Sequence, residues 1–130
     1  MLKIDGRQGE GGGQILRTSL SLAALTGRPF TLTHIRANRQ QPGLRPQHLT
    51  AVHAVAAVCG AALEGAAIGS QTLVFQPQVA PQGATYRFDV ADAAQGGSAG
   101  AVTLIWQALI WPLLFAQSKS HVTLHGGTHV

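Results

Sequence analysis

Residues 5–17 read DGRQGEGGGQILR, and the rest of the chain is arranged around this stretch. Glycine fills five of the nine positions 6–14, and an apolar run, Ile15–Leu25, follows at once. Glycine loses more entropy on folding than any other residue and packs no side chain, so this concentration indicates backbone that turns sharply or approaches a ligand closely. The pattern predicts a strand over residues 2–5, a glycine loop, and a helix that begins near Gly13.

The glycine loop has features of an anion site. A helix that starts directly behind it offers free backbone N–H groups and the positive end of its dipole. Glu10 lies inside the loop, where a carboxylate beside a phosphate is unfavourable unless a divalent cation lies between them, so Glu10 is a candidate metal ligand. The loop is neither a Walker A motif, since no Lys-Ser/Thr follows the glycines, nor a Rossmann fingerprint, since the spacing differs. From the loop alone, a phosphate site and a plain tight connection are both open.

The composition suits a single domain with a real core, since 45% of the 130 residues are hydrophobic. Only 11% are charged, so little surface serves solvation alone, and helices buried on more than one face are expected. The net charge is +4, and Arg36, Arg39 and Arg45 lie in one short segment, with Arg7 and Arg17 near the glycine loop. Clustered guanidinium groups favour phosphate recognition. The alternative is a generally basic surface.

The single cysteine, Cys59, lies in an apolar run and is expected to be a core residue in a reducing, cytoplasmic setting. No signal peptide opens the chain, because charged and polar residues stand where its apolar segment would lie. The apolar segment 101–116 is interrupted by Gln107 and Pro112 and is too short to span a bilayer comfortably, so no membrane partner is expected.

Hydrophobic periodicity and turn residues predict nine elements in the order β-α-β-α-β-β-β-α-β. The expected strands span residues 2–5, 30–35, 62–68, 72–76, 85–90 and 121–125, and the expected helices span 13–26, 47–59 and 101–115. Gly27 and Gly60 stand where helix C-caps are expected, Pro46 suits the first turn of the second helix, and Pro112 should kink or shorten the third. The order predicts an α/β fold, an α+β sandwich with helices on a mixed sheet, in which residues 62–76 form a hairpin.

The first helix carries two apolar stripes, one of Leu16, Leu20, Ala23 and Ala24 and one of Ile15, Leu22 and Leu25. A helix with one buried face needs a single stripe, so both sides of this helix are expected to be covered. Either a partner, such as a second copy of the chain in a homo-oligomer, or sequence that this chain lacks could cover the exposed apolar helix faces.

The isolated polar residues are less informative. His34 is expected to pack at the end of its strand. His48 and His53 are not four residues apart and have no acidic neighbour, so a zinc site there is not expected. Gln107 is the only strongly polar side chain of the third helix, and either a polar site or a core partner would account for it.

Several blocks of the chain closely resemble the RNA 3′-terminal phosphate cyclases. These blocks are QGEGGGQILR at 8–17, IRANR at 35–39, PGLRPQHLTAV at 42–52, EGA at 64–66, GSQ at 69–71, YRFD at 86–89 and GGTH at 126–129. The resemblance implies an enzyme that uses ATP and a divalent metal (Mg or Mn) to adenylate one of its own histidines. AMP then passes to the 3′-terminal phosphate of an RNA, and the neighbouring 2′-hydroxyl attacks to give a 2′,3′-cyclic phosphate.

The resemblance also implies roles for individual residues. It assigns the metal to Glu10, ATP to Gln14 and Gln107, and RNA or phosphate contacts to Arg17, Arg36, Arg39 and Gln47. The family's nucleophilic histidine lies beyond the last residue, Val130, so this chain contains no catalytic residue and is expected to be an N-terminal fragment that is inactive alone. Residues 92–96 look like an insertion before the third helix, which could displace Gln107.

The family's large domain is built from repeats of two helices on a four-stranded sheet, and residues 1–130 would cover the first repeat and the start of the second. Two other readings are open. One is a non-catalytic RNA-binding module, as in cyclase-like proteins of ribosome assembly. The other is a decayed gene product that folds poorly and associates through exposed apolar faces.

Overall fold

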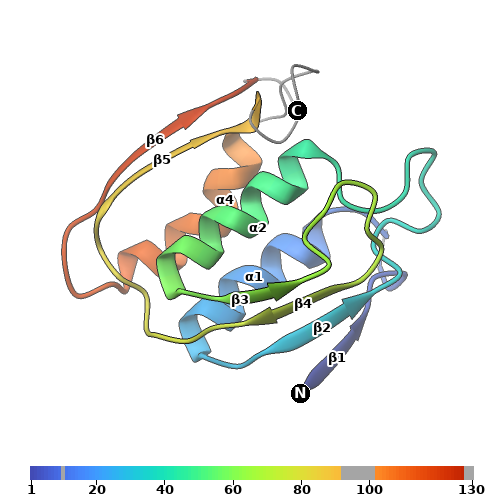
Figure 1. Ribbon diagram of the computed structural model, residues 1–130, viewed down its shortest axis with the longest axis horizontal. Coiled ribbons are helices and arrows are strands. Elements are labelled where there is room, and N and C mark those ends of the chain that lie inside the picture. Colours follow the sequence, from blue (N-terminus) through green and yellow to red (C-terminus); the bar gives the residue numbers. More distant parts are fainter. Residues whose placement is uncertain (10, 92–101, 128–130) are drawn as a thin grey trace.

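A computed structural model describes residues 1–9, 11–91 and 102–127 (Figure 1). Its strands are β1 (Leu2–Asp5), β2 (Phe30–Thr33), β3 (Ala62–Glu64), β4 (Leu73–Gln76), β5 (Thr85–Asp89) and β6 (His121–His125). Its helices are α1 (Gln14–Thr26), α2 (Pro46–Cys59) and α4 (Val102–Leu114). The order of these elements is the one predicted from periodicity, so that prediction is confirmed.

The larger sheet has four strands in the order β1-β2-β4-β3. β1 runs parallel to β2, with Leu2 opposite Phe30, and α1 makes the crossover between them. β4 is antiparallel to both β2 and β3, so the predicted hairpin is present and the sheet is mixed. β5 and β6 form a separate parallel pair, with Thr85 opposite His121, and α4 lies between them in sequence.

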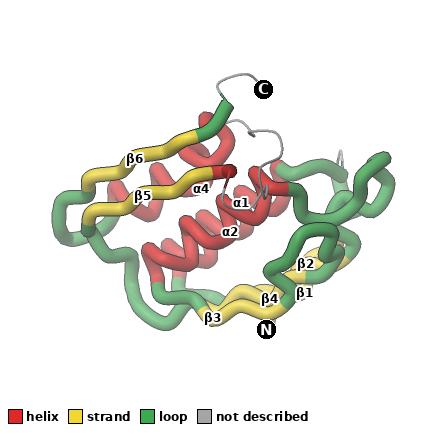
Figure 2. Tube along the Cα trace, turned by 45° about the horizontal axis from the view of Figure 1, so that its top comes forward, coloured by secondary structure: helices red, strands yellow, loops and turns green. Residues whose placement is uncertain are grey.

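The elements stack in three layers, one more than the predicted sandwich of helices on a mixed sheet. α1 and α2 lie on one face of the four-stranded sheet, and α4 packs against both of these helices (Figure 1). The β5–β6 pair lies on the opposite side of the helices from the larger sheet (Figure 2). The helices are therefore the shared middle layer.

The core lies between α1, α2 and the larger sheet. Leu16 and Leu20 of α1 and Val52 of α2 are fully buried there. Phe30 of β2 and Phe75 of β4 stack with ring centroids 5.5 Å apart. Cys59 is also fully buried, and burial raises the pKa of its thiol to about 11, which confirms its prediction as a core residue.

The glycine and proline residues predicted at the ends of the first two helices are confirmed. Gly27 and Gly60 cap α1 and α2 with φ of 74° and 59°, a left-handed conformation that favours glycine. Pro46 is the first residue of α2, where its missing N–H costs nothing. Pro112 lies in the last turn of α4, which ends at Leu114, so the predicted shortening amounts to one residue.

Two strands end earlier than predicted. β2 stops at Thr33, because His34 takes a φ of 53° that cannot continue a strand, and its exposed side chain does not pack as expected. β3 stops at Glu64, because Gly65 has a φ of 78° and lies against the carbonyl of Thr72.

The expected cover on both sides of α1 is only partly present. The stripe that includes Leu16 and Leu20 is buried, whereas Leu22 of the second stripe is 54% exposed and Leu25 is half-buried. α4 covers part of that second side. Among the described residues, no helix combines the length and the apolar character that a membrane span requires.

Candidate phosphate-binding site

The amino ends of α1 and α2 meet at Gly13. A Cβ atom built on Gly13 would lie 2.7 Å from His48 Nε2 and 2.8 Å from Arg17 Nη1, so any side chain there would displace these two groups. α1 begins one residue later, at Gln14, and His48 lies in the first turn of α2. Both positive helix ends therefore point to one region, which is a favourable arrangement for an anion.

His48 is a buried, neutral member of this region. Its Nδ1 accepts a hydrogen bond of 3.0 Å from the backbone N–H of Arg45, the residue that caps α2. Only 4% of His48 is exposed, and burial, followed by the positive charges of Arg36, Arg17 and Arg45, lowers its pKa to about 3. A neutral imidazole with Nδ1 as acceptor carries its proton on Nε2, the nitrogen that faces Gly13.

Arg36 is held in an unusual backbone conformation at the same place. Its φ is 48°, and its Nη1 donates to the carbonyl oxygens of Gln41 at 2.7 Å and Gly43 at 2.9 Å. Burial lowers the pKa of its guanidinium, and the nearby positive charges of Arg39 and Arg45 lower it further. Strained residues of this kind persist only where the surroundings fix them, and they concentrate at functional sites.

Backbone hydrogen bonds fix the arginine-rich loop between β2 and α2. Ile35 N–H donates to Gln71 O at 3.0 Å, and Leu44 N–H donates to Ser70 O at the same distance. In return, Gly69 N–H donates to Leu44 O at 2.8 Å. The loop therefore takes its shape from the β3–β4 connection and not from its own sequence alone.

The two glutamines with an expected ATP role lie on one groove. Gln14 and Arg17 of α1 and Gln107 of α4 line a groove of about 740 Å³ between these helices. Gln14 donates to Thr18 Oγ1 at 3.1 Å and accepts from Arg17 Nη2 at 3.2 Å. Arg17 thus belongs to both the groove and the surroundings of His48.

The rest of this groove is mostly apolar. Its remaining lining residues are Thr18, Ser21, Leu22, Leu25, Ile110, Trp111 and Phe115. A mixed lining of this sort, with a few polar groups at one place and aromatic surface at another, is common in small-molecule sites.

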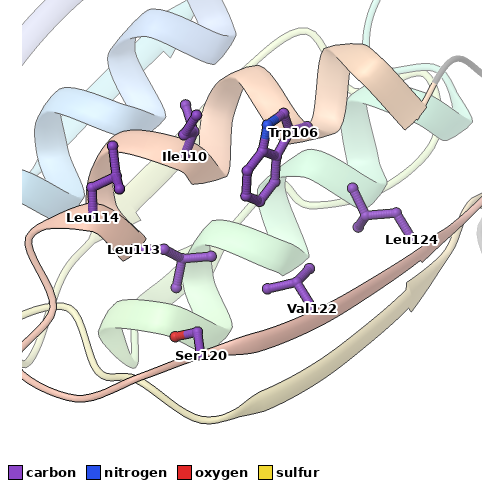
Figure 3. Close-up of a pocket in the computed structure, with 7 residues that line it drawn as sticks. All are labelled: Trp106, Ile110, Leu113, Leu114, Ser120, Val122 and Leu124. Carbon is purple, nitrogen blue, oxygen red and sulfur yellow. The ribbon is translucent and has the colours of Figure 1, made fainter.

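A second groove, between α4 and β6, has a different character (Figure 3). It has a volume of about 540 Å³, and its lining residues are Trp106, Ile110, Leu113, Leu114, Ser120, Val122 and Leu124. No lining residue is titratable, and the polar groups are the Ser120 hydroxyl and the Trp106 indole N–H, so this groove offers no charged group for phosphate chemistry.

The remaining predicted residues have less structural support. Gln47 is the second residue of α2 and is half-buried, and Arg39 is exposed in the β2–α2 loop. Glu10 and the apparent insertion 92–96 lie outside the described residues. Within the described part of the chain, no group of three or more His, Cys, Asp or Glu residues could hold a metal ion.

Two members of the site were missed by sequence reasoning: Gly13 as a contact point and His48. The capping-box spacing of Arg45 and His48, with Pro46 in the first helical turn, was a usable signal. The contact between His48 and Gly13 was not, because it joins residues far apart in the sequence.

Comparison with known proteins shows the family of this chain. Residues 8–130 match the family model described as RNA 3'-terminal phosphate cyclase. The chain is similar over its whole length to proteins named RNA 3'-terminal phosphate cyclase: it is 55% identical to one from Nostoc sp., 58% to one from Gloeothece citriformis and 56% to one from Methylococcus capsulatus. It spans 37% of the length of the Nostoc relative and 36% of that from Methylococcus. The chain belongs to the RNA 3'-terminal phosphate cyclase family.

Proposed function

We propose that this chain forms the phosphate-binding portion of an ATP-dependent RNA 3′-phosphate cyclase. The observation that carries the proposal is the meeting of two helix amino ends among Arg17, Arg36, Arg39 and Arg45. Guanidinium groups and helix amino ends both favour a phosphate, and an RNA 3′-terminal phosphate is a dianion that such a region would hold. Gln47, at the start of α2, would contact the same terminus.

ATP would occupy the groove between α1 and α4. Gln14 and Gln107 would contact the nucleotide, and Arg17 would lie between the nucleotide and the RNA end. A shared arginine is useful here because the two phosphates must approach one another despite like charge. The support is the common lining of one groove by residues more than ninety positions apart in sequence.

The proposed reaction has three steps. A histidine of the enzyme attacks the α-phosphorus of ATP and releases diphosphate; an oxygen of the RNA 3′-phosphate then displaces the histidine from AMP. The 2′-hydroxyl finally attacks the activated 3′-phosphorus, AMP leaves, and the cyclic phosphate closes. Adenylation supplies a good leaving group, and the vicinal hydroxyl reacts with the advantage of proximity. Because no histidine of this chain matches the family's nucleophile, we expect the isolated chain to form no adenylate.

A divalent metal is part of the proposal on the resemblance alone. Its expected ligand is Glu10, which lies outside the described residues, and the described part of the chain holds no three-ligand group. The residues that the structure describes are therefore assigned only to binding phosphate and nucleotide.

We also propose that β5, α4 and β6 open a second structural repeat. Two observations support this division. β1–α1–β2 and β5–α4–β6 are both strand-helix-strand units, and in both the two strands pair in parallel. Residues 1–84 would then form the first repeat, with α1 and α2 on its four-stranded sheet.

The direct test compares RNA oligonucleotides of one sequence with a 3′-phosphate or a 3′-hydroxyl end. We expect tighter binding of the 3′-phosphate, measured by fluorescence anisotropy, and a loss of that preference in Arg36→Ala. Equal affinity for both ends, with a steep salt dependence, would instead support a non-catalytic RNA-binding module. Incubation with labelled ATP and metal should give no covalent adduct on a denaturing gel, and a stable acid-labile adduct would contradict the assignment of the nucleophile.

A further inference from the structure

His48 is a titratable side chain that contacts both helix ends of the site. On one side its Nδ1 accepts the N–H of Arg45, the capping residue of α2. On the other side its Nε2 faces Gly13, the capping residue of α1. The ring therefore spans the gap between the starts of the two helices.

Gly13 is needed for space and not for backbone conformation. Its φ of −79° and ψ of −12° are open to any residue. A Cβ atom there would lie 2.7 Å from Nε2 and 2.9 Å from Cδ2 of His48, closer than real Cβ contacts come. The absence of a side chain at position 13 allows the imidazole to touch the backbone of the other helix.

We propose that His48 is a positioning residue whose ring sets the register of α2 against α1. Through that register it fixes the distance between Arg17, one turn into α1, and Arg36 and Arg45 beside α2. A phosphate group held between those arginines would depend on this distance, so the inference rests on the proposed function.

The chemistry of imidazole suits this role. A cationic side chain at position 48 would add a further like charge to a region that already holds several arginines. A carboxylate would cancel part of the positive field that attracts the phosphate. An apolar ring would fill the space but leave the N–H of Arg45 without its acceptor. Neutral imidazole fills the space, accepts that hydrogen bond and adds no charge.

The test uses His48→Asn in the 130-residue chain and inorganic pyrophosphate as the probe. Asparagine Oδ1 occupies the place of Nδ1 and keeps the acceptor for Arg45, but the side chain no longer reaches Gly13. We expect pyrophosphate affinity, measured by isothermal titration calorimetry, to fall roughly tenfold, the scale of one charge-assisted hydrogen bond. Measurements are made at a temperature at which circular dichroism shows every variant folded.

Two controls separate positioning from stability. His53→Asn changes an exposed histidine on the same helix and should leave the affinity unchanged. Val55→Ala removes buried core volume from α2 and should lower the melting temperature without changing the affinity of the folded protein. If Val55→Ala weakens pyrophosphate binding as much as His48→Asn does, His48 serves stability alone and the inference is wrong.

A second perturbation approaches the same contact from α1. Gly13→Ala should weaken pyrophosphate binding in the wild-type background, because a Cβ atom at position 13 would lie 2.7 Å from His48 Nε2 and 2.8 Å from Arg17 Nη1. In His48→Asn the shorter side chain removes the first of these contacts and leaves the one with Arg17, so the further loss should be smaller than in the wild type. Additive losses would contradict the proposed contact. Unchanged affinity in His48→Asn would overturn the positioning role while leaving the phosphate site intact. A wild-type chain that binds neither pyrophosphate nor RNA 3′-phosphate would instead overturn the proposed function.

Discussion

His48 carries no charge at neutral pH, and its surroundings explain why. Burial removes the ring from water, and Arg36, Arg17 and Arg45 repel an added proton, so its pKa falls from 6.5 to about 3. The unfolded chain has no such restraint and binds a proton there at mildly acidic pH. Folding stability is therefore linked to pH through this residue.

We expect the free energy of unfolding to fall as the pH is lowered from about 6.5 towards 3. In this window the unfolded state binds a proton at His48 and the folded state does not, so the stability present above the ordinary pKa is lost at up to about 1.4 kcal/mol per pH unit. Urea denaturation between pH 7 and roughly pH 4.5, compared with the same series for His48→Asn, measures the contribution. Parallel curves for the two proteins would show that His48 titrates normally in the folded state.

Asp5 affects the stability in a different pH range, so its contribution can be separated from that of His48. Hydrogen bonds from Arg7 lower the pKa of this carboxyl from 3.8 to about 2. Its contribution is present above pH 3.8 and is lost only as the pH falls towards 2. The comparison above pH 4.5 therefore reports on His48 and not on Asp5.

At the residue scale, the chemical role of a side chain was easier to predict from the sequence than the residues that it contacts. Arg36 and Arg39 stood out as candidate phosphate ligands because they cluster with Arg45 in one short segment, and the family resemblance assigned them the same role. His48 was set aside because only a metal site was considered for it, and its neighbours in sequence gave no acidic partner. Its real partners, Gly13 and Arg17, come from another helix, and no local pattern reports such a meeting.

The helices and strands were predictable because glycine and proline residues mark where several of them begin and end. Gly27 and Gly60 end two helices in left-handed conformations, and Pro46 begins the second. The errors fall where local backbone departs from the regular pattern: a positive φ at His34 stops β2, and the turn at Gly65 stops β3. The alternation of apolar and polar side chains continues past a residue in the left-handed conformation. The sequence pattern therefore does not reveal that such a residue ends the strand.

The β2–α2 loop and the β3–β4 connection should behave as one unit, and Gly43 joins them. Gly43 has a φ of 81° and its Cα lies against the carbonyl of Gly69, so Gly43→Ala meets both backbone strain and a backbone clash. Gly69 has a φ of 82° with open space around it, so Gly69→Ala meets the strain alone. We expect Gly69→Ala to cost about 1 kcal/mol and Gly43→Ala roughly 2 kcal/mol more, by urea denaturation.

The same pair of variants tests whether the loop shapes the phosphate site. Arg36 donates to the carbonyl of Gly43, so displacement of this backbone should move the guanidinium. Gly43→Ala should then bind pyrophosphate less tightly than Gly69→Ala. Equal affinities, despite unequal stabilities, would mean that the arginines tolerate movement of the loop.

At the scale of the whole molecule, the three-layer arrangement leaves one side of the middle layer open. The low charged fraction predicted helices buried on more than one face, and the larger sheet accounts for only one of them. Leu22 of α1, Trp111 of α4 and Phe115, the residue after α4, line the groove between these helices and are 54%, 54% and 69% exposed. The composition indicated that the apolar faces of the helices must be buried on more than one side, but it could not indicate which of these faces would remain exposed.

That open surface predicts self-association of the 130-residue chain. Large exposed apolar patches on soluble proteins mark contact surfaces or aggregation sites, and removing this one from water is favourable. We expect size-exclusion chromatography with light scattering to give a weight-average mass that rises with protein concentration.

The double variant Trp111→Gln, Phe115→Gln should run as a monomer, because neutral polar side chains remove the apolar surface without changing the net charge. The matched control is Ile68→Gln, Val79→Gln, which alters two exposed apolar residues that do not line the groove and should associate like the wild type. If the control pair abolishes association as well, the contact surface lies elsewhere. A wild-type chain that stays monomeric at every concentration would show that the apolar residues of the α1–α4 groove remain exposed to water and do not drive self-association.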